Sequence, residues 1–160
     1  MPPTWKAVIV LLASVSIARA DSKAPAPPAP DLVVTWQEGE RSKDMSIWTT
    51  TIEVTGTKLH VARTYAGRNG GRPGTKPVEV EGTVKDPRKL AAALAALDKI
   101  KVRPPKQLTD PQQMRLREGC ITRGKATRCA SAMGSEPDPE ELKAIAAVRD
   151  ALLDGVQLPP

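Results

Sequence analysis

Large aromatic side chains are scarce in this sequence. It has no phenylalanine, one tyrosine and three tryptophans in 160 residues. The core of a folded domain must therefore be built from Val, Ile, Leu and Ala, which makes a covalent cross-link useful. Aromatic residues are also not interleaved with the basic ones as a single-stranded nucleic-acid surface requires, so we expect no nucleic-acid partner.

Motifs for catalysis, metal binding and nucleotide binding are missing as well. His60 is the only histidine, so the chain lacks the ligands of a His-rich metal site, and the sequence does not place a Ser-His-Asp triad around it. We interpret His60 as an exposed strand residue. The glycine-rich segment 66–77 has neither G-x-G-x-x-G nor Walker spacing and lies between two expected strands. We therefore expect no metal and no cofactor.

No apolar run is long enough to span a membrane, which takes about 20 residues in a helix. The uncharged run at 7–17 follows Lys6 and precedes the sequence A-R-A at 18–20. This arrangement is typical of a secretory signal peptide over residues 1–20, cleaved after residue 20, with a short buried N-terminal helix as the alternative. We expect a periplasmic or secreted protein without a transmembrane segment.

Proline is plentiful just after the expected cleavage point. Residues 21–30 (DSKAPAPPAP) include four prolines, which fix φ and remove backbone donors, so this segment is predicted to be a disordered linker. Residues 31–158 remain for folding, a length that suits one domain. Removing residues 1–20 lowers the formal net charge from +6 to +4.

Alternating and β-branched segments predict four antiparallel strands with one apolar and one wet face. They cover residues 32–38, 47–54, 59–65 and 78–84. The TGTK sequence around Gly56 predicts the hairpin turn between the second and the third.

Two helices are predicted from capping residues and apolar stripes. Each begins at an Asp-Pro pair, at 86–87 and at 138–139, in which the carboxylate caps the first turn and proline suits the first helical position. The first helix ends near Ile100 and the second before Gly155. The predicted buried stripes are Leu90, Leu94 and Leu97 in the first helix and Leu142, Ile145, Val148 and Leu152 in the second.

The two cysteines, Cys120 and Cys129, enclose the sequence ITRGKATR. A two-residue turn at Gly124-Lys125 places them opposite each other at a non-hydrogen-bonded position of a hairpin, where Cα atoms are about 4.5 Å apart. That spacing suits a disulfide. A redox-active pair is the alternative, but such pairs usually form a C-x-x-C motif at a helix start. We predict a structural disulfide.

Basic residues gather in two segments. Residues 101–129 have a net charge of +6, and residues 130–160 a net charge of −4. This asymmetry indicates either neutralisation within the fold or a basic patch for an anionic partner. The candidate binding residues lie in the Gly/Arg loop and in the hairpin: Arg68, Arg72, Lys76, Arg123, Lys125 and Arg128.

Together these patterns predict an α+β domain. It has a four-stranded antiparallel sheet covered by a helix, a disulfide-tied β-hairpin and a C-terminal helix. The function predicted by elimination is a non-enzymatic binding or accessory module that binds an anionic envelope component or protein. One alternative is a secreted protein inhibitor that uses the rigid hairpin. Another is a hydrolase with Glu79 and Glu81 as paired carboxylates. Trp36 and Trp48 are assigned to the core in preference to ligand stacking.

Overall fold

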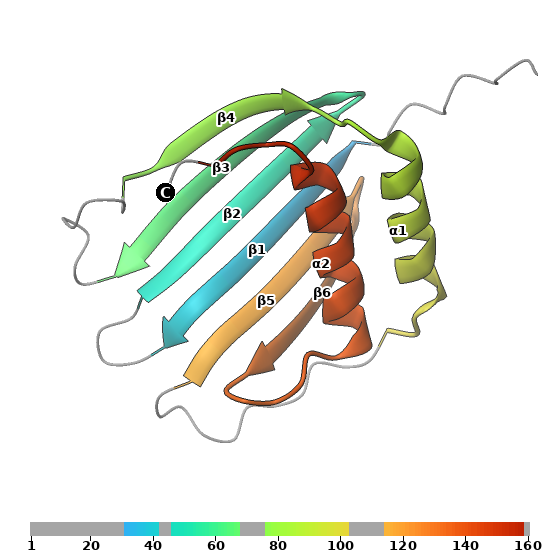
Figure 1. Cartoon of the computed structure of the whole chain (residues 1–160). Helices are drawn as coiled ribbons and strands as arrows, with labels where there is room; N and C mark the ends of the chain where they lie inside the picture. The colour runs from blue at the N-terminus through green and yellow to red at the C-terminus, as the bar shows by residue number, and fades with distance from the viewer. Residues whose placement is uncertain (1–30, 42–45, 68–75, 103–113, 159–160) are drawn as a thin grey trace, which may run out of the picture.

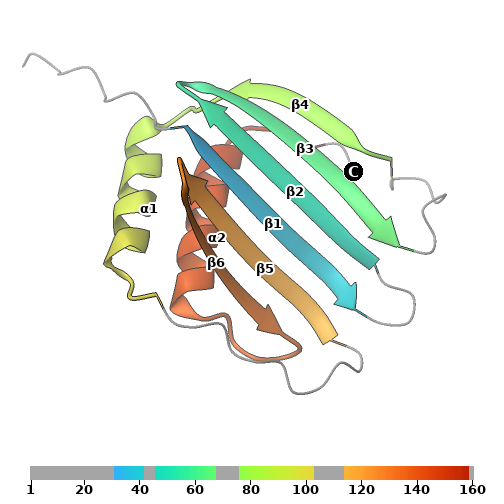
Figure 2. The same cartoon turned by 180° about the vertical axis from the view of Figure 1, so that it is seen from behind.

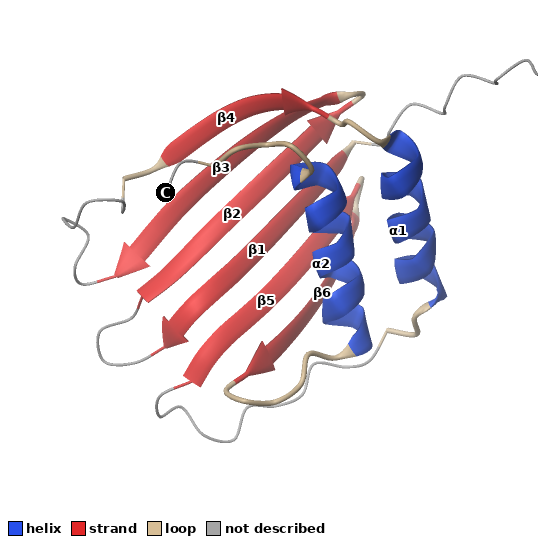
Figure 3. Cartoon of the chain, in the orientation of Figure 1, coloured by secondary structure: helices blue, strands red, loops and turns tan. Residues whose placement is uncertain are grey.

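One antiparallel sheet of six strands carries two helices on the same face, as Figures 1 and 3 show. The structure is a computed structural model, and it describes residues 31–41, 46–67, 76–102 and 114–158. The lateral order of the strands is β4-β3-β2-β1-β5-β6. In chain order the elements are β1 (Leu32–Arg41), β2 (Ser46–Thr55), β3 (Lys58–Gly67), β4 (Val78–Thr83), α1 (Pro87–Lys99), β5 (Met114–Arg123), β6 (Ala126–Met133) and α2 (Glu140–Leu153).

The predicted signal peptide and linker, residues 1–30, lie outside the described residues, so export stays a prediction. No helix in the described ranges is long and apolar enough to cross a membrane.

The α+β class is confirmed, but the prediction of a four-stranded sheet beside a separate hairpin is wrong. β5 pairs antiparallel with β1 along the whole strand, from Leu32 opposite Arg123 to Arg41 opposite Met114. β1 is therefore bonded on both edges, and the hairpin of β5 and β6 extends the same sheet. Side-chain alternation along a strand predicts its buried face. It does not predict the lateral neighbours, because these depend on residues far away in the chain.

The core lies between the helices and the end of the sheet where β1 begins. α2 packs on β5 and β6, and α1 packs beside α2 (Figure 1). Both predicted helical stripes are confirmed as buried. The sheet contributes fully buried aliphatic side chains from four strands: Leu32, Val34, Ile52, Leu59, Val61 and Ile121.

Gly119 on β5 allows α2 to approach the sheet closely. A Cβ atom at this position would lie 2.7 Å from Cγ2 of Ile145 and 2.9 Å from Cε3 of Trp36. Any larger residue would push α2 or Trp36 away from the sheet, so the small size of residue 119 sets the helix-to-sheet distance.

The two Asp-Pro pairs have different roles. Asp86 caps α1 as predicted, because its carboxylate accepts hydrogen bonds from the backbone N–H groups of Arg88 and Lys89, each at 3.0 Å. The predicted cap of α2 by Asp138 is wrong. α2 begins after Pro139 without a side-chain cap, and the Asp138 carboxylate instead accepts a hydrogen bond from Nε of Arg117 at 2.6 Å. A nearby arginine on β5, distant in sequence, competes successfully for this carboxylate.

The disulfide hairpin is confirmed. Cys120 lies opposite Cys129 with Cα atoms 4.1 Å apart, and the two are joined by a disulfide. Gly124 has a φ of 57°, the positive value that the turn requires.

Charged side chains lie on both faces of the sheet, and Glu38 and Glu40 of β1 are on the helix side. Every arginine of β3, β5 and β6 is in register with the buried residues and so lies on the helix side. Figure 2 shows the sheet from behind, where neither helix covers it. Here the register places the glutamates of β2, β4 and β5: Glu53, Glu79, Glu81 and Glu118. Arg123 and Arg128, the two strand cations predicted to bind a partner, therefore lie on the helix side.

Candidate functional site

Arg128, one of the predicted binding residues, joins three parts of the fold. Its Nε donates to Oε1 of Glu141 at 2.6 Å, and its Nη1 donates to the carbonyl oxygen of Leu97 at 2.8 Å. Its Nη2 donates to the carbonyl oxygen of Ile100. The side chains of Arg128 and Glu141 are only 17% and 8% exposed. Arg128 thus neutralises a buried acid and satisfies carbonyls at the end of α1.

The other predicted cations of the hairpin differ in their surroundings. Arg123 forms an ion pair with Asp98 of α1, which lowers the pKa of that carboxyl through a hydrogen bond and raises the pKa of the guanidinium. Lys125 lies exposed in the turn. β5 is paired along its length with β1, so only the turn residues extend beyond the sheet.

Gly67, where the Gly/Arg loop leaves β3, lies at the opposite end of the sheet from the hairpin turn. Of its predicted residues, Lys76 is exposed, whereas Arg68 and Arg72 lie outside the described residues. Gly67, the last residue of β3, is level with Glu40 of β1 across the paired strands. The hairpin turn follows Arg123, which lies opposite Leu32 at the other end of β1. Leu32 and Glu40 are separated by about 27 Å along β1, because an antiparallel strand rises about 3.4 Å per residue. The described start of the Gly/Arg loop therefore does not lie next to the hairpin turn.

Beside the end of β3, aromatic and arginine side chains meet on the helix side of the sheet. The guanidinium carbon of Arg63 lies 4.4 Å from the ring centroid of Trp48. The rings of Trp48 and Tyr65 are 4.9 Å apart at an interplanar angle of 55°, and the Tyr65 hydroxyl is 2.9 Å from Oγ of Ser46. All four side chains are partly exposed. We call Ser46, Trp48, Arg63 and Tyr65 the Trp48 cluster.

The Trp48 cluster lies beyond both helices. β2 begins and β3 ends at a corner of the sheet that neither α1 nor α2 covers (Figure 1). The next row inward contains Trp36, which is 6% exposed and has the guanidinium carbon of Arg149 of α2 4.1 Å from its ring centroid. Trp36 thus belongs to the core, as predicted, whereas Trp48 is only half-buried and not part of the core cluster.

The Trp48 cluster was not predicted from the sequence, although a signal for it was present. In the expected strands 47–54 and 59–65, the alternation puts Trp48, Arg63 and Tyr65 at the positions of the apolar side. The TGTK turn fixes the register of β2 and β3, which places Trp48 opposite Tyr65 and Arg63 one row away. An arginine among half-buried aromatic residues on a core face is a candidate cation–π pair.

The two alternative carboxylates lie on the opposite face. Glu79 and Glu81 are exposed residues of the edge strand β4, and Oε1 of Glu81 is 2.8 Å from Nδ1 of His60 on β3. Glu53 lies opposite His60 on β2. These acids raise the pKa of His60, mainly through the hydrogen bond with Glu81. Neither Glu79 nor Glu81 lines the pocket described below, so this arrangement does not favour the hydrolase alternative.

We expect the pKa of His60, followed by NMR titration, to lie above its ordinary value of about 6.5. Glu81→Gln should return it towards that value, whereas Glu79→Gln should have a smaller effect because Glu79 acts only through its charge. The pair stabilises the fold fully below the pKa of the unfolded state, and this contribution is lost as the pH rises through the folded-state pKa. Equal effects of the two substitutions would contradict the assignment.

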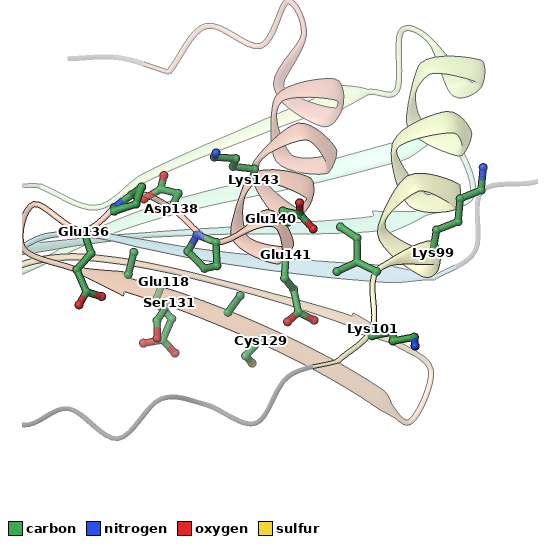
Figure 4. Close-up of a pocket in the computed structure, with 15 residues that line it drawn as sticks. Lys99, Lys101, Glu118, Cys129, Ser131, Glu136, Asp138, Glu140, Glu141 and Lys143 are labelled. Carbon is green, nitrogen blue, oxygen red and sulfur yellow. The ribbon is translucent and has the colours of Figure 1, made fainter.

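A pocket of about 850 Å³ lies along β6, beside the end of α1 and the start of α2 (Figure 4). Ala130 and Ala132 of β6 line it together with Ile100, Pro139 and Glu141 on the helix side of the sheet. On the other side of the sheet it is lined by Glu118, Cys129 and Ser131. The pocket thus extends past the edge of β6 on both sides of the sheet.

Within the described part of the chain, no group of three or more His, Cys, Asp or Glu side chains is placed to hold a metal ion. In comparisons with known proteins, no family model, no curated protein and no solved structure matches this chain.

Proposed function

We propose that the chain is an exported, non-enzymatic binding module, and that it binds a carboxylate-bearing partner at the Trp48 cluster. The observation that supports this proposal is the position of Arg63 over the half-buried ring of Trp48, at a corner of the sheet beyond the helices. Among the described residues, Arg63 forms no ion pair with an acid. Its guanidinium is therefore not neutralised by a direct ion pair, unlike those of Arg123 and Arg128. On the same face of the sheet, Glu38 lies opposite Trp48 and Glu40 opposite Ser46.

The chemistry of this cluster suits a carboxylate next to a flat or apolar group. A guanidinium presents planar, paired donors that match a carboxylate, and the neighbouring ring restricts its motion before binding. Restricting the side chain in advance reduces the entropy lost on association. Trp48 and Tyr65 add aromatic surface to which the rest of the partner can pack.

The sequence that follows the cluster favours the same partner. Residues 66–77 continue directly from β3 and contain three cations and no acid, Arg68, Arg72 and Lys76. Because Gly67 lies two positions after Tyr65 on β3, this segment starts next to the Trp48 cluster. The disulfide is typical of proteins in oxidising compartments, which agrees with the predicted export.

The test is a titration of the purified protein, followed by tryptophan fluorescence, with polygalacturonate and with polyglutamate as carboxylate probes. Arg63→Ala should weaken binding about tenfold, the effect of losing about 1.4 kcal/mol. Arg88→Ala, an equal charge change at an exposed position on α1, is the matched control. Raising the salt concentration should weaken binding of the unsubstituted protein.

The two probes distinguish a glycan carboxylate from a protein carboxylate, and neutral dextran controls for polymer binding in general. Tight binding of either probe that depends on Arg63 supports the proposal. Equal losses in Arg63→Ala and Arg88→Ala, or equally tight binding of dextran, would overturn it.

A further inference from the structure

β6 is an edge strand that pairs only with β5. The register of the hairpin determines which of its backbone N–H and C=O groups bond to β5 and which point outward. The pair that flanks the two-residue turn is hydrogen-bonded, and hydrogen-bonded pairs recur at every second residue. The bond from the Gly134 N–H to the Arg115 carbonyl, 2.9 Å long, continues this order beyond the strand. Ala130 and Ala132 therefore bond to β5, whereas the N–H and C=O groups of Cys129 and Ser131 point outward.

This edge lacks the features that usually protect an exposed strand. Proteins discourage edge pairing with lysine, proline, bulges or charges along the strand. β6 has the sequence ATRCASAM, with eight consecutive residues in register and only one charged side chain, Arg128, which is occupied within the fold. The opposite edge, β4, is shorter and carries Glu79 and Glu81. The described part of the sheet is thus open to pairing mainly along β6.

The pocket lies along the same stretch of backbone. Its lining includes every residue from Cys129 to Ala132 (Figure 4). The outward-pointing backbone groups of Cys129 and Ser131 therefore border the pocket. Since the pocket continues on both sides of the sheet, there is room for side chains of alternating direction. Space of this form beside an unpaired edge fits an extended polypeptide.

We propose that an extended segment of a partner protein adds to β6 as a seventh strand of the sheet. Its backbone exchanges hydrogen bonds with Cys129 and Ser131. This surface is separate from the Trp48 cluster, because β6 and the β2–β3 pair lie on opposite sides of β1 in the strand order.

The side chains around the edge define the class of the segment. A residue opposite Ser131 points to the same side of the sheet as Ser131 and Glu118, which are cross-strand neighbours. Glu118 forms no ion pair with another described residue, and the small Ser131 leaves its carboxylate accessible from the edge. A lysine or arginine is therefore preferred at that position. The flanking residues point towards Ala130, Ala132 and Ile100, where small apolar side chains are preferred.

Amide hydrogen exchange measured by NMR tests this proposal, with the peptide acetyl-Thr-Val-Lys-Val-Thr-amide as probe and its Glu-containing analogue as control. In the free protein, the amides of Cys129 and Ser131 should exchange rapidly and those of Ala130 and Ala132 slowly. Saturation with the lysine peptide should slow exchange at Cys129 and Ser131. Glu118→Gln should weaken binding of the lysine peptide about tenfold and strengthen binding of the Glu analogue, because it removes the like charge.

Ser131→Pro is the decisive variant. It removes one outward N–H without breaking a bond to β5, a position at which an edge strand tolerates proline. The variant should keep the unfolding midpoint within a few degrees and lose peptide binding. Arg63→Ala should bind the peptide normally, which separates this site from the carboxylate site.

Three results would overturn the proposal. The first is slow exchange at Cys129 and Ser131 in the free monomer, which would mean that the chain itself covers the edge. The second is protection of these amides by a concentration-dependent dimer, which would make a second copy the occupant. The third is failure of the lysine peptide to protect either amide at millimolar concentration.

Discussion

Arg128→Ala should lower the free energy of unfolding by about 3 kcal/mol, because removing one member of a buried ion pair leaves the other charge buried and uncompensated. The remaining charge is that of Glu141, whose side chain is 8% exposed. The substitution also removes the donors to the carbonyl oxygens of Leu97 and Ile100 at the end of α1. Urea denaturation followed by circular dichroism measures the loss.

Arg123→Ala is the matched control for this prediction. Arg123 also joins the hairpin to α1, but its partner Asp98 is 51% exposed, so the loss should be below about 1 kcal/mol. The double variant Arg128→Met with Glu141→Leu should recover most of the stability, because apolar residues often replace a buried ion pair at little cost. Similar losses in Arg128→Ala and Arg123→Ala would show that the surroundings of Arg128 do not stabilise the fold as described.

Removing the disulfide should lower the free energy of unfolding by about 2.5 to 3 kcal/mol, the value expected for closing a loop of this length. The bond joins residues nine positions apart, and it lies within the sheet between β5 and β6. The measurement is the urea midpoint of the Cys120→Ala, Cys129→Ala variant against the oxidised protein, with the reduced unsubstituted protein as a second comparison.

The control for the disulfide is Thr122→Ala with Thr127→Ala. These residues form the next cross-strand pair towards the turn, and their hydroxyl oxygens are 3.0 Å apart on the exposed face. Their loss should have a much smaller effect, because it leaves the entropy of the unfolded chain unchanged. A double-cysteine variant as stable as the oxidised protein would mean that the turn alone already orders the hairpin in the unfolded chain.

Two predictions for neighbouring residues, the pairing of Cys129 and the surface position of Arg128, depend on different kinds of information. The pairing of Cys120 with Cys129 depends on a turn and on spacing within ten residues, so local rules were sufficient. Arg128 was assigned to a binding surface because it is basic and near other cations. The same register places it opposite Ile121, a core residue, which indicates that Arg128 lies on the core side. Its partners, on α1 and α2, are far away in the sequence.

The Trp48 cluster and the pocket beside β6 also differ in how much of each could be predicted from the sequence. Predictions that used strand periodicity placed Trp48, Arg63 and Tyr65 correctly on one side of the sheet. That side was treated as core throughout, because periodicity does not show how far the helices extend over it. The pocket beside β6 was not predicted, since it depends on where α1 ends and α2 begins relative to an edge that sequence analysis treated as a separate hairpin.

By itself, the sequence determined the helices with their buried stripes, the side of β2 and β3 that faces the helices, and the cysteine pairing. These features follow from turns, caps and side-chain periodicity over a few residues. Only the tertiary structure decided that β1 lies inside a six-stranded sheet, that Asp138 pairs with Arg117, and that Arg128 is buried against two helices. These outcomes depend on contacts between residues that are far apart in the sequence, because α1 connects β4 to β5 at the other side of the sheet. Patterns over a few residues do not determine such contacts.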